Sequence, residues 1–216
     1  ITLDSASTAI ASEGIDVDLN STITSLSVGH ITPLSIATGK RLSGAVTVSA
    51  GSIKLDETGT FASNVAMSGG TLDVDETSTV SGALTQSGNI TIDVLTDKIL
   101  TYSGAGVNID ANTLTLSGGG TLNNTNTFVL NNDDSKLLLN SITLNSASTS
   151  ADSLGIDVDA NSTINTLTIG NVTPLSIAAG TSLEGGITVS AGSLKLSETG
   201  TLASTLNMSG GTLDID

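Results

Sequence analysis

The amino-acid sequence predicts an all-β protein, specifically a parallel β-helix (β-solenoid) with about 19–20 residues per coil. Two observations predict this fold. A small-residue turn, Ser49-Ala50-Gly51-Ser52, recurs at a constant step as Ser68-Gly69-Gly70-Thr71 and again as Ser87-Gly88-Asn89-Ile90. Apolar positions between these turns keep the same step, from Val46 to Val65 to Leu84. A period near 20 made of strand-length segments indicates a solenoid in which each period is one coil.

A longer repeat is superimposed on the short one. Residues 1–75 return as residues 142–216 at a constant offset of 141, and 50 of the 75 paired positions are identical. Apolar residues exchange for other apolar residues, as Phe61 does for Leu202, whereas polar residues such as Lys40 vary freely. Inward and outward positions of a packed rod should differ in this way. We therefore expect a single continuous solenoid over 1–216, with a long repeat 1–141 and a partial second copy 142–216.

The composition excludes several classes of protein. Twenty-one acidic residues against six basic ones give a formal net charge of −15, which repels nucleic acid, so we expect no nucleic-acid partner. No run of 18 apolar residues occurs, so we expect no membrane insertion. The chain has three aromatic residues and no cysteine. Its core must be built from aliphatic side chains in a narrow interior and held by coil stacking alone.

The individual elements follow from alternation and turn residues, taken in chain order. Residues 1–4 read as a strand, and residues 5–14 and their counterparts 146–155 read as loops that leave the rod. Alternation resumes at residues 14–18, and later strands are expected at 90–94, 98–103, 107–110, 113–117 and 136–145. No segment has helical periodicity.

The repeat also predicts how the coils stack. Equivalent strands lie about 4.8 Å apart in a parallel solenoid, which gives roughly ten coils and a rod about 50 Å long. We expect a right-handed coil, as is usual for parallel crossovers, with a left-handed coil as the alternative. The residues predicted to point into the rod are Val48, Ile53, Leu55, Met67, Leu72 and Val74, with their counterparts Val189, Leu194, Leu196, Met208, Leu213 and Ile215.

The segments VSAGSIKLDETGT, MSGGTLDVDETSTV and LSGGGTLNN are similar to the Gly-Gly-Thr-Leu type coils of bacterial autotransporter passengers and filamentous-haemagglutinin-like adhesins. The near-identical 141-residue unit is more like that of giant repetitive surface proteins. The resemblance implies a secreted right-handed β-helix that acts as a stalk, adhesin or surface filament. It carries over no catalytic residue.

Paired carboxylates form the main candidate binding site. The residues are Asp16, Asp18, Asp73, Asp75, Asp157 and Asp159, and each Asp-x-Asp pair places two carboxylates on one exposed strand face. Stacked over adjacent coils they could hold Ca²⁺, which takes six to eight oxygen ligands. The alternative is a solvated acidic face that blocks lateral sheet association, and this is the interpretation that we favour. We expect no other metal, no cofactor and no catalytic residue, and hence no enzyme.

We therefore expect a structural extracellular protein whose stiff β-helical rod is part of a cell-surface fibre, sheath or adhesin shaft. The alternative is a carbohydrate- or Ca²⁺-binding adhesin module that recognises a host or matrix glycan through its loops. Both ends of the sequence read as strands without a polar cap. We expect neighbouring repeats or subunits to cover them end to end.

Overall fold

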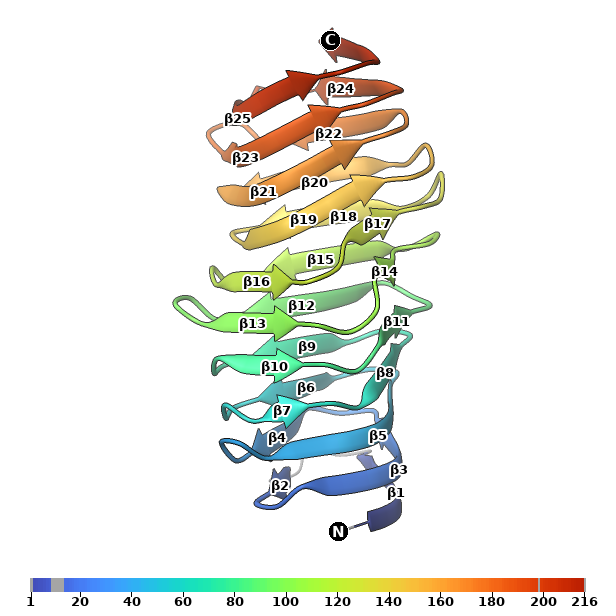
Figure 1. The fold of residues 1–216 in the computed structure, drawn as a ribbon, viewed down its shortest axis with the longest axis vertical. Helices are drawn as coiled ribbons and strands as arrows, with labels where there is room; N and C mark the ends of the chain where they lie inside the picture. The colour runs from blue at the N-terminus through green and yellow to red at the C-terminus, as the bar shows by residue number, and fades with distance from the viewer. Residues whose placement is uncertain (1, 9–13, 198, 216) are drawn as a thin grey trace.

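The computed structural model describes residues 2–8, 14–197 and 199–215, and within them every regular element is a β-strand (Figure 1). All strand pairs are parallel, and the strands belong to two sheets that run along one rod. The predicted all-β parallel solenoid is thereby confirmed.

The first sheet, sheet A, has 15 strands. They are β1 (Thr2–Thr8), β3 (Ser21–Val28), β5 (Arg41–Val48), β7 (Thr60–Phe61), β8 (Asn64–Met67), β10 (Ser78–Val80), β11 (Leu84–Gln86), β13 (Ile99–Tyr102), β14 (Val107–Asn108), β16 (Thr121–Asn124), β17 (Phe128–Leu130), β19 (Thr143–Thr149), β21 (Ser162–Ile169), β23 (Ser182–Val189) and β25 (Thr201–Met208).

The second sheet, sheet B, has 11 strands. They are β2 (Ile15–Val17), β4 (Thr32–Ile36), β6 (Ser52–Leu55), β9 (Thr71–Val74), β12 (Ile90–Val94), β15 (Thr113–Ser117), β18 (Lys136–Asn140), β20 (Gly155–Ala160), β22 (Thr173–Ile177), β24 (Ser193–Ser197) and β26 (Thr212–Ile215).

The solenoid is right-handed. In Figure 1 the chain rises from the N-terminus at the bottom, the strands of sheet A run to the right at the front, and those of sheet B run to the left behind them. This is the expected hand, which a right-twisted strand favours when it crosses over to a parallel neighbour.

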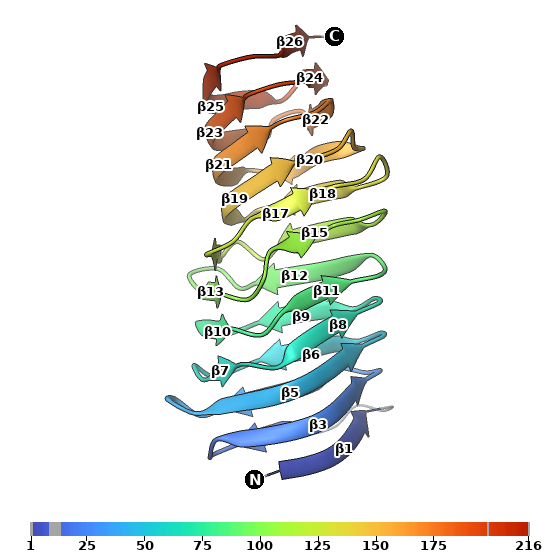
Figure 2. The same ribbon diagram turned by 45° about the vertical axis from the view of Figure 1, so that its right-hand side comes forward.

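Sheet A bends around one corner of the rod, which gives the coil a third side. In the outer coils a single long strand makes the bend, whereas in the middle coils two short strands replace it (Figure 2). Strand β5 shows the change directly, because its first half pairs with β7 and its second half with β8.

Glycine allows the long strands to bend. Gly44 in β5 and its counterpart Gly185 in β23 have φ of 132° and 120°, a region that L side chains rarely adopt. A Cβ at Gly44 would lie on the carbonyl oxygen of Ile23 in the coil below, and the register between β3 and β5 shifts by one residue there. The bend therefore requires glycine for its conformation and for the close approach of the neighbouring backbone.

The core is a set of columns in which each inward residue lies over its equivalent in the next coil. One column on sheet B runs through Leu34, Leu55, Val74 and Val94, all of which are buried. The six inward positions predicted between Val48 and Val74 are confirmed, as are Val189 and Leu194, because each is at most 2% exposed.

The C-terminal coils depart from the prediction. In the last coil, formed by β25 and β26, Leu213 is only partly buried, while Met208 is 42% and Ile215 71% exposed, and Leu196 in β24, one coil below, is also only partly buried. Their register is as expected, because Met208 pairs with Val189 and Ile215 with Leu196 in the inward columns. Their inward direction is therefore as predicted, and Leu213, Met208 and Ile215 remain incompletely buried because no coil among the described residues lies over β25 and β26.

The coil length is also less uniform than predicted. Thr60 pairs with Thr79, in keeping with the short period, but Ile90 pairs with Leu114 and Thr113 with Lys136, so the middle coils are several residues longer. The extra residues lie in the turns, where Asp97 and Asp110 adopt left-handed φ of 64° and 51°. The inward columns keep their register because the insertions stay outside the strands.

The predicted loops at residues 5–14 and 146–155 are shorter than expected. Strand β1 continues to Thr8 and β19 to Thr149, so Ser5 and Ser146 lie within strands, and the second loop is confined to 150–154. Residues 9–13 of the first loop lie outside the described residues. Small side chains hid the alternation, although Ala147 is an inward residue that is almost fully buried.

We expect Val74→Asp to lower the free energy of unfolding by roughly 3 kcal/mol or more, because it places an unpaired carboxylate in a column where Val74 is fully buried. Ile215→Asp is the matched control, since it changes the equivalent position of the uncovered coil. Urea denaturation should show a large loss for the first variant and a small one for the second. Equal losses would contradict the assigned columns.

Candidate functional site

The outer face of sheet B brings together charged residues from successive coils. Asp73 in β9 pairs in register with Lys54 on the coil below and with Asp93 on the coil above. Strands of one sheet are about 4.8 Å apart, so three charged side chains are stacked on neighbouring strands. The chain places them there because Lys54, Asp73 and Asp93 each occupy an outward position between two buried residues.

A row of ion pairs continues along the same side of the rod. Lys54 bonds to Asp75, Lys98 Nζ lies 2.7 Å from Glu76 Oε2, and Lys136 bonds to Asp157. Each pair joins two different coils, and its side chains are about one-third exposed. Exposed pairs of this kind contribute about 1 kcal/mol at most, so they adjust the surface charge more than they hold the fold together.

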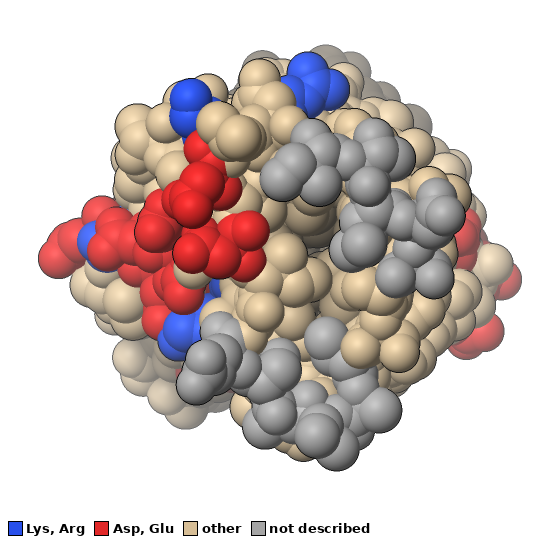
Figure 3. Space-filling view, turned by 90° about the horizontal axis from the view of Figure 1, so that it is seen from below, with Lys and Arg blue, Asp and Glu red and all other residues tan. Residues whose placement is uncertain are grey.

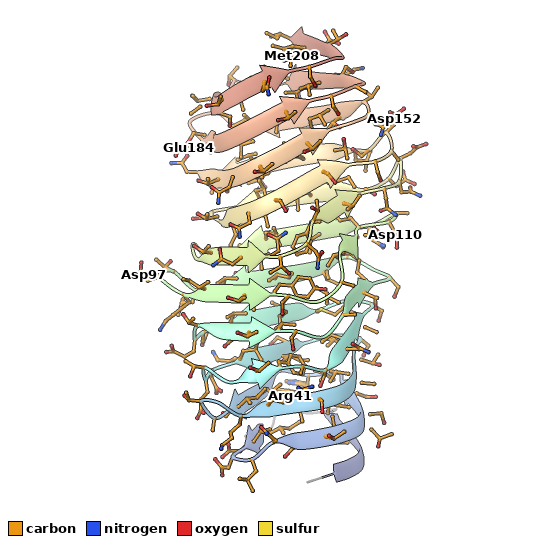
Figure 4. All side chains as sticks on the ribbon, viewed as in Figure 1. Arg41, Asp97, Asp110, Asp152, Glu184 and Met208 are labelled. Atoms are coloured by element: carbon orange, nitrogen blue, oxygen red, sulfur yellow. The ribbon has the colours of Figure 1, made fainter. Side chains whose placement is uncertain are left out.

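Acidic side chains are most concentrated at one edge of the rod. Seen from the N-terminal end, red side chains gather on one side of the molecule, with a smaller group opposite (Figure 3). Figure 4 places Asp97 and Glu184 on the side where sheet B turns into sheet A, and Asp110 and Asp152 on the opposite side. The chain has 21 acidic residues and six basic ones, so carboxylates outnumber cations on this surface.

Asp73 has the most perturbed environment among these carboxylates. Burial raises the pKa of Asp73 above its ordinary value, and the neighbouring carboxylates Asp75 and Asp93 raise it further. Lys54 opposes this shift but does not cancel it, because its ammonium is bonded to Asp75. The ionised form of Asp73 is therefore held at a cost to the fold.

A shallow groove of about 440 Å³ lies over this part of sheet B. It is lined by Ile31, Gly51, Ser52, Thr71, Asp73, Thr91 and Asp93. The stacked hydroxyls and carboxylates can exchange hydrogen bonds with a polar ligand. None of the lining residues is aromatic, so the groove offers no ring on which a sugar could stack.

The six calcium candidates do not come together as one site. Asp16 pairs with Ser35, Asp75 is bonded to Lys54, and Asp157 is bonded to Lys136, well along the rod. Asp159 lies within β20, whereas Asp18 and Asp75 each follow the last residue of their strand, so the Asp16/Asp18 and Asp73/Asp75 pairs do not lie wholly on one strand face as predicted. Within the described ranges, no three His, Cys, Asp or Glu side chains are arranged to hold a metal ion.

Sequence reasoning missed two members of this cluster. Asp93 was not among the candidates, and Lys54 was not recognised as a neighbour of Asp73. The signal for Lys54 was available, since it precedes Asp73 by one period of the short repeat. Serine also joins the outer face, as Ser35 Oγ donates a hydrogen bond of 2.8 Å to Asp56 Oδ1 on the next coil.

Comparisons with family models, with curated proteins and with solved structures found no match to this chain. Its class is therefore defined by the fold, a parallel β-solenoid with a polar and largely acidic exterior. None of the described residues belongs to a helix long and apolar enough to cross a membrane.

We expect Asp73→Asn to raise the melting temperature at pH 7 and to change it much less at pH 3. The folded-state pKa of Asp73 is raised, so its ionised form destabilises the fold above that pKa, and the effect disappears as pH falls below the unfolded value of about 3.9. The control is Asp214→Asn, because Asp214 is the equivalent of Asp73 in the long repeat and no described coil covers it. A lower melting temperature for Asp73→Asn at pH 7 would contradict this electrostatic assignment.

We expect calcium to have little effect on stability. Thermal melts in excess EDTA and in millimolar calcium should agree within a few degrees, because Lys54 and Lys136 already engage two of the candidate carboxylates. Magnesium at the same ionic strength controls for screening. A large rise in melting temperature with calcium alone would reassign the Asp-x-Asp pairs as ligands.

Proposed function

We propose that this protein is a structural repeat protein, whose stiff rod forms part of an extracellular cell-surface fibre, sheath or adhesin shaft. One observation carries the proposal. Sheet B and the main path of sheet A each run through 11 strands from one end of the described chain to the other, without a break in the parallel pairing. A molecule organised in this way is a spacer, since its length is set by the number of coils.

The bonding between coils supports a load-bearing role. Backbone hydrogen bonds point along the rod, for example from Ser68 N to Val48 O and from Ser87 N to Met67 O, both at 2.9 Å. Each coil is thus bonded to the next on all its sides, and the stacked apolar columns keep water out of the interior. Bending the rod would require many of these bonds to lengthen together.

The surface supports the same role. The net charge of −15 keeps the exterior soluble, and the acidic outer face of sheet B disfavours lateral pairing of rods. The two copies of the 141-residue repeat differ freely at outward polar positions and keep their inward positions apolar. This is expected of a protein whose role depends on the shape of the rod and not on particular surface side chains. The similarity of its coils to those of repetitive bacterial surface proteins favours a location outside the cell.

We expect the purified chain to form rods about 50 Å long at low concentration and end-to-end multiples at high concentration. Small-angle scattering and sedimentation from micromolar to millimolar protein would measure both, and Met208→Asp with Ile215→Asp should suppress the multiples.

Antibody labelling of intact and permeabilised source cells would test the location. Globular particles, or labelling only after permeabilisation, would overturn the proposal, and a monomer at every concentration would contradict end-to-end association.

A further inference from the structure

The last coil, formed by β25 and β26, presents an open apolar end. Along its upper side Met208 and Ile215 are exposed and Leu202, Leu206 and Leu213 are only partly buried. A pocket of about 200 Å³ opens there between Leu175, Ile177, Leu196, Leu202 and Ile215. Figure 4 shows Met208 on this uppermost coil.

The same positions are fully covered one long repeat earlier. The equivalents of Leu202, Leu206, Met208, Leu213 and Ile215 are Phe61, Val65, Met67, Leu72 and Val74, and each of these is at most 2% exposed. The two sets differ in the coil above them. Among the described residues, such a coil covers the set that begins with Phe61 and does not cover the set that begins with Leu202.

The covering coil consists of residues 76–95. Val80 lies over Phe61, Leu84 over Val65, Ile92 over Leu72, and Val94 over Val74. Its backbone donates hydrogen bonds downward, from Ser81 N to Phe61 O at 3.0 Å, from Ser87 N to Met67 O at 2.9 Å and from Leu95 N to Val74 O at 3.0 Å.

The open end retains the features that this coil requires. The carbonyls of Leu202, Met208 and Ile215 occupy the positions of the acceptors just named. The three apolar exchanges compensate one another in part, because Leu202 is smaller than Phe61, whereas Leu206 and Ile215 are larger than Val65 and Val74. A surface that keeps the acceptors and stays apolar at these positions fits the same kind of coil.

We propose that the open end is the docking surface for a coil with the sequence of residues 76–95, in the register that this coil has over β7, β8 and β9. The proposal rests on the proposed function, since it specifies which coil continues the rod. It commits to a coil of this chain's own repeat as the occupant.

The test is a fusion in which a second copy of residues 76–95 follows Asp216, as Glu76 follows Asp75 in the chain. The readout is oxidation by hydrogen peroxide, which converts exposed methionine to the sulfoxide. The chain has two methionines, Met208 being 42% exposed and Met67 1%. At low protein concentration, mass spectrometry should show Met208 oxidising readily in the parent chain and at least about tenfold more slowly in the fusion.

Two matched controls sharpen the result. A fusion with Val80→Asn, Leu84→Asn and Ile92→Asn in the added copy should leave Met208 unprotected. A fusion with residues 98–117, the following coil, tests specificity. Equal protection by that segment would overturn the proposed sequence preference and leave the rod function intact.

Met67 reports whether the rod itself stays folded. If Met67 becomes oxidised in the 76–95 fusion, the test is repeated with a longer fusion that adds residues 76–140. Loss of Met67 protection in both fusions counts against the proposal, because a compatible coil leaves the coils below undisturbed. Small-angle scattering distinguishes a failure of the docking assignment from a failure of the proposed function. Rods with an unprotected Met208 overturn only the docking assignment, whereas the absence of rods in the parent chain overturns the proposed function.

Discussion

The structure depends on one constraint, which is that a coil buries its apolar row only when another coil lies over it. The interior is a narrow set of aliphatic columns, in which each side chain packs against those of its own coil and the next. Met67 and Met208 show the constraint directly, because they occupy equivalent positions in the sequence repeat and differ in the coil above. Stability in such a rod is a sum of contacts between neighbouring coils, and the uncovered coil is its weakest part.

The same constraint separates what can vary from what cannot. Inward positions must keep the columns aligned, so the middle coils accommodate their additional residues in turns such as the one at Asp97. Outward positions carry no such requirement, and the equivalents of Lys40 and Asp56 in the second copy are Thr181 and Ser197. Stacking nevertheless acts on the outer face as well, because it brings Asp73 close to Lys54 and Asp93 whatever their separation along the chain.

The fold could be predicted from the sequence because the constant step of the short repeat determines the register, and the register determines which residues face inward. The failures have physical reasons. Ser5 to Thr8 were mistaken for a loop, since hydroxyl and methyl side chains do not alternate clearly in polarity, although a ladder to β3 orders them. The environment of Asp73 depends on Asp93, which follows it by 20 residues, one period of the short repeat, so the sequence step connects them and the pairing was overlooked. Burial at Met208 and Ile215 depends on a neighbour above, which periodicity alone does not specify.

The polarity of the described surface disfavours contact between the sides of two rods. The sides of the rod carry ion pairs, hydroxyls and an excess of carboxylates, and two such surfaces repel each other when they approach. The last coil is apolar and offers a row of unpaired strand edge along its upper side. In the proposed end-to-end association the contact is heterologous, and a contact of that kind extends as an open filament when the rotation between units does not close a ring. Such an association suits the proposed role, because each added coil lengthens the rod without thickening it.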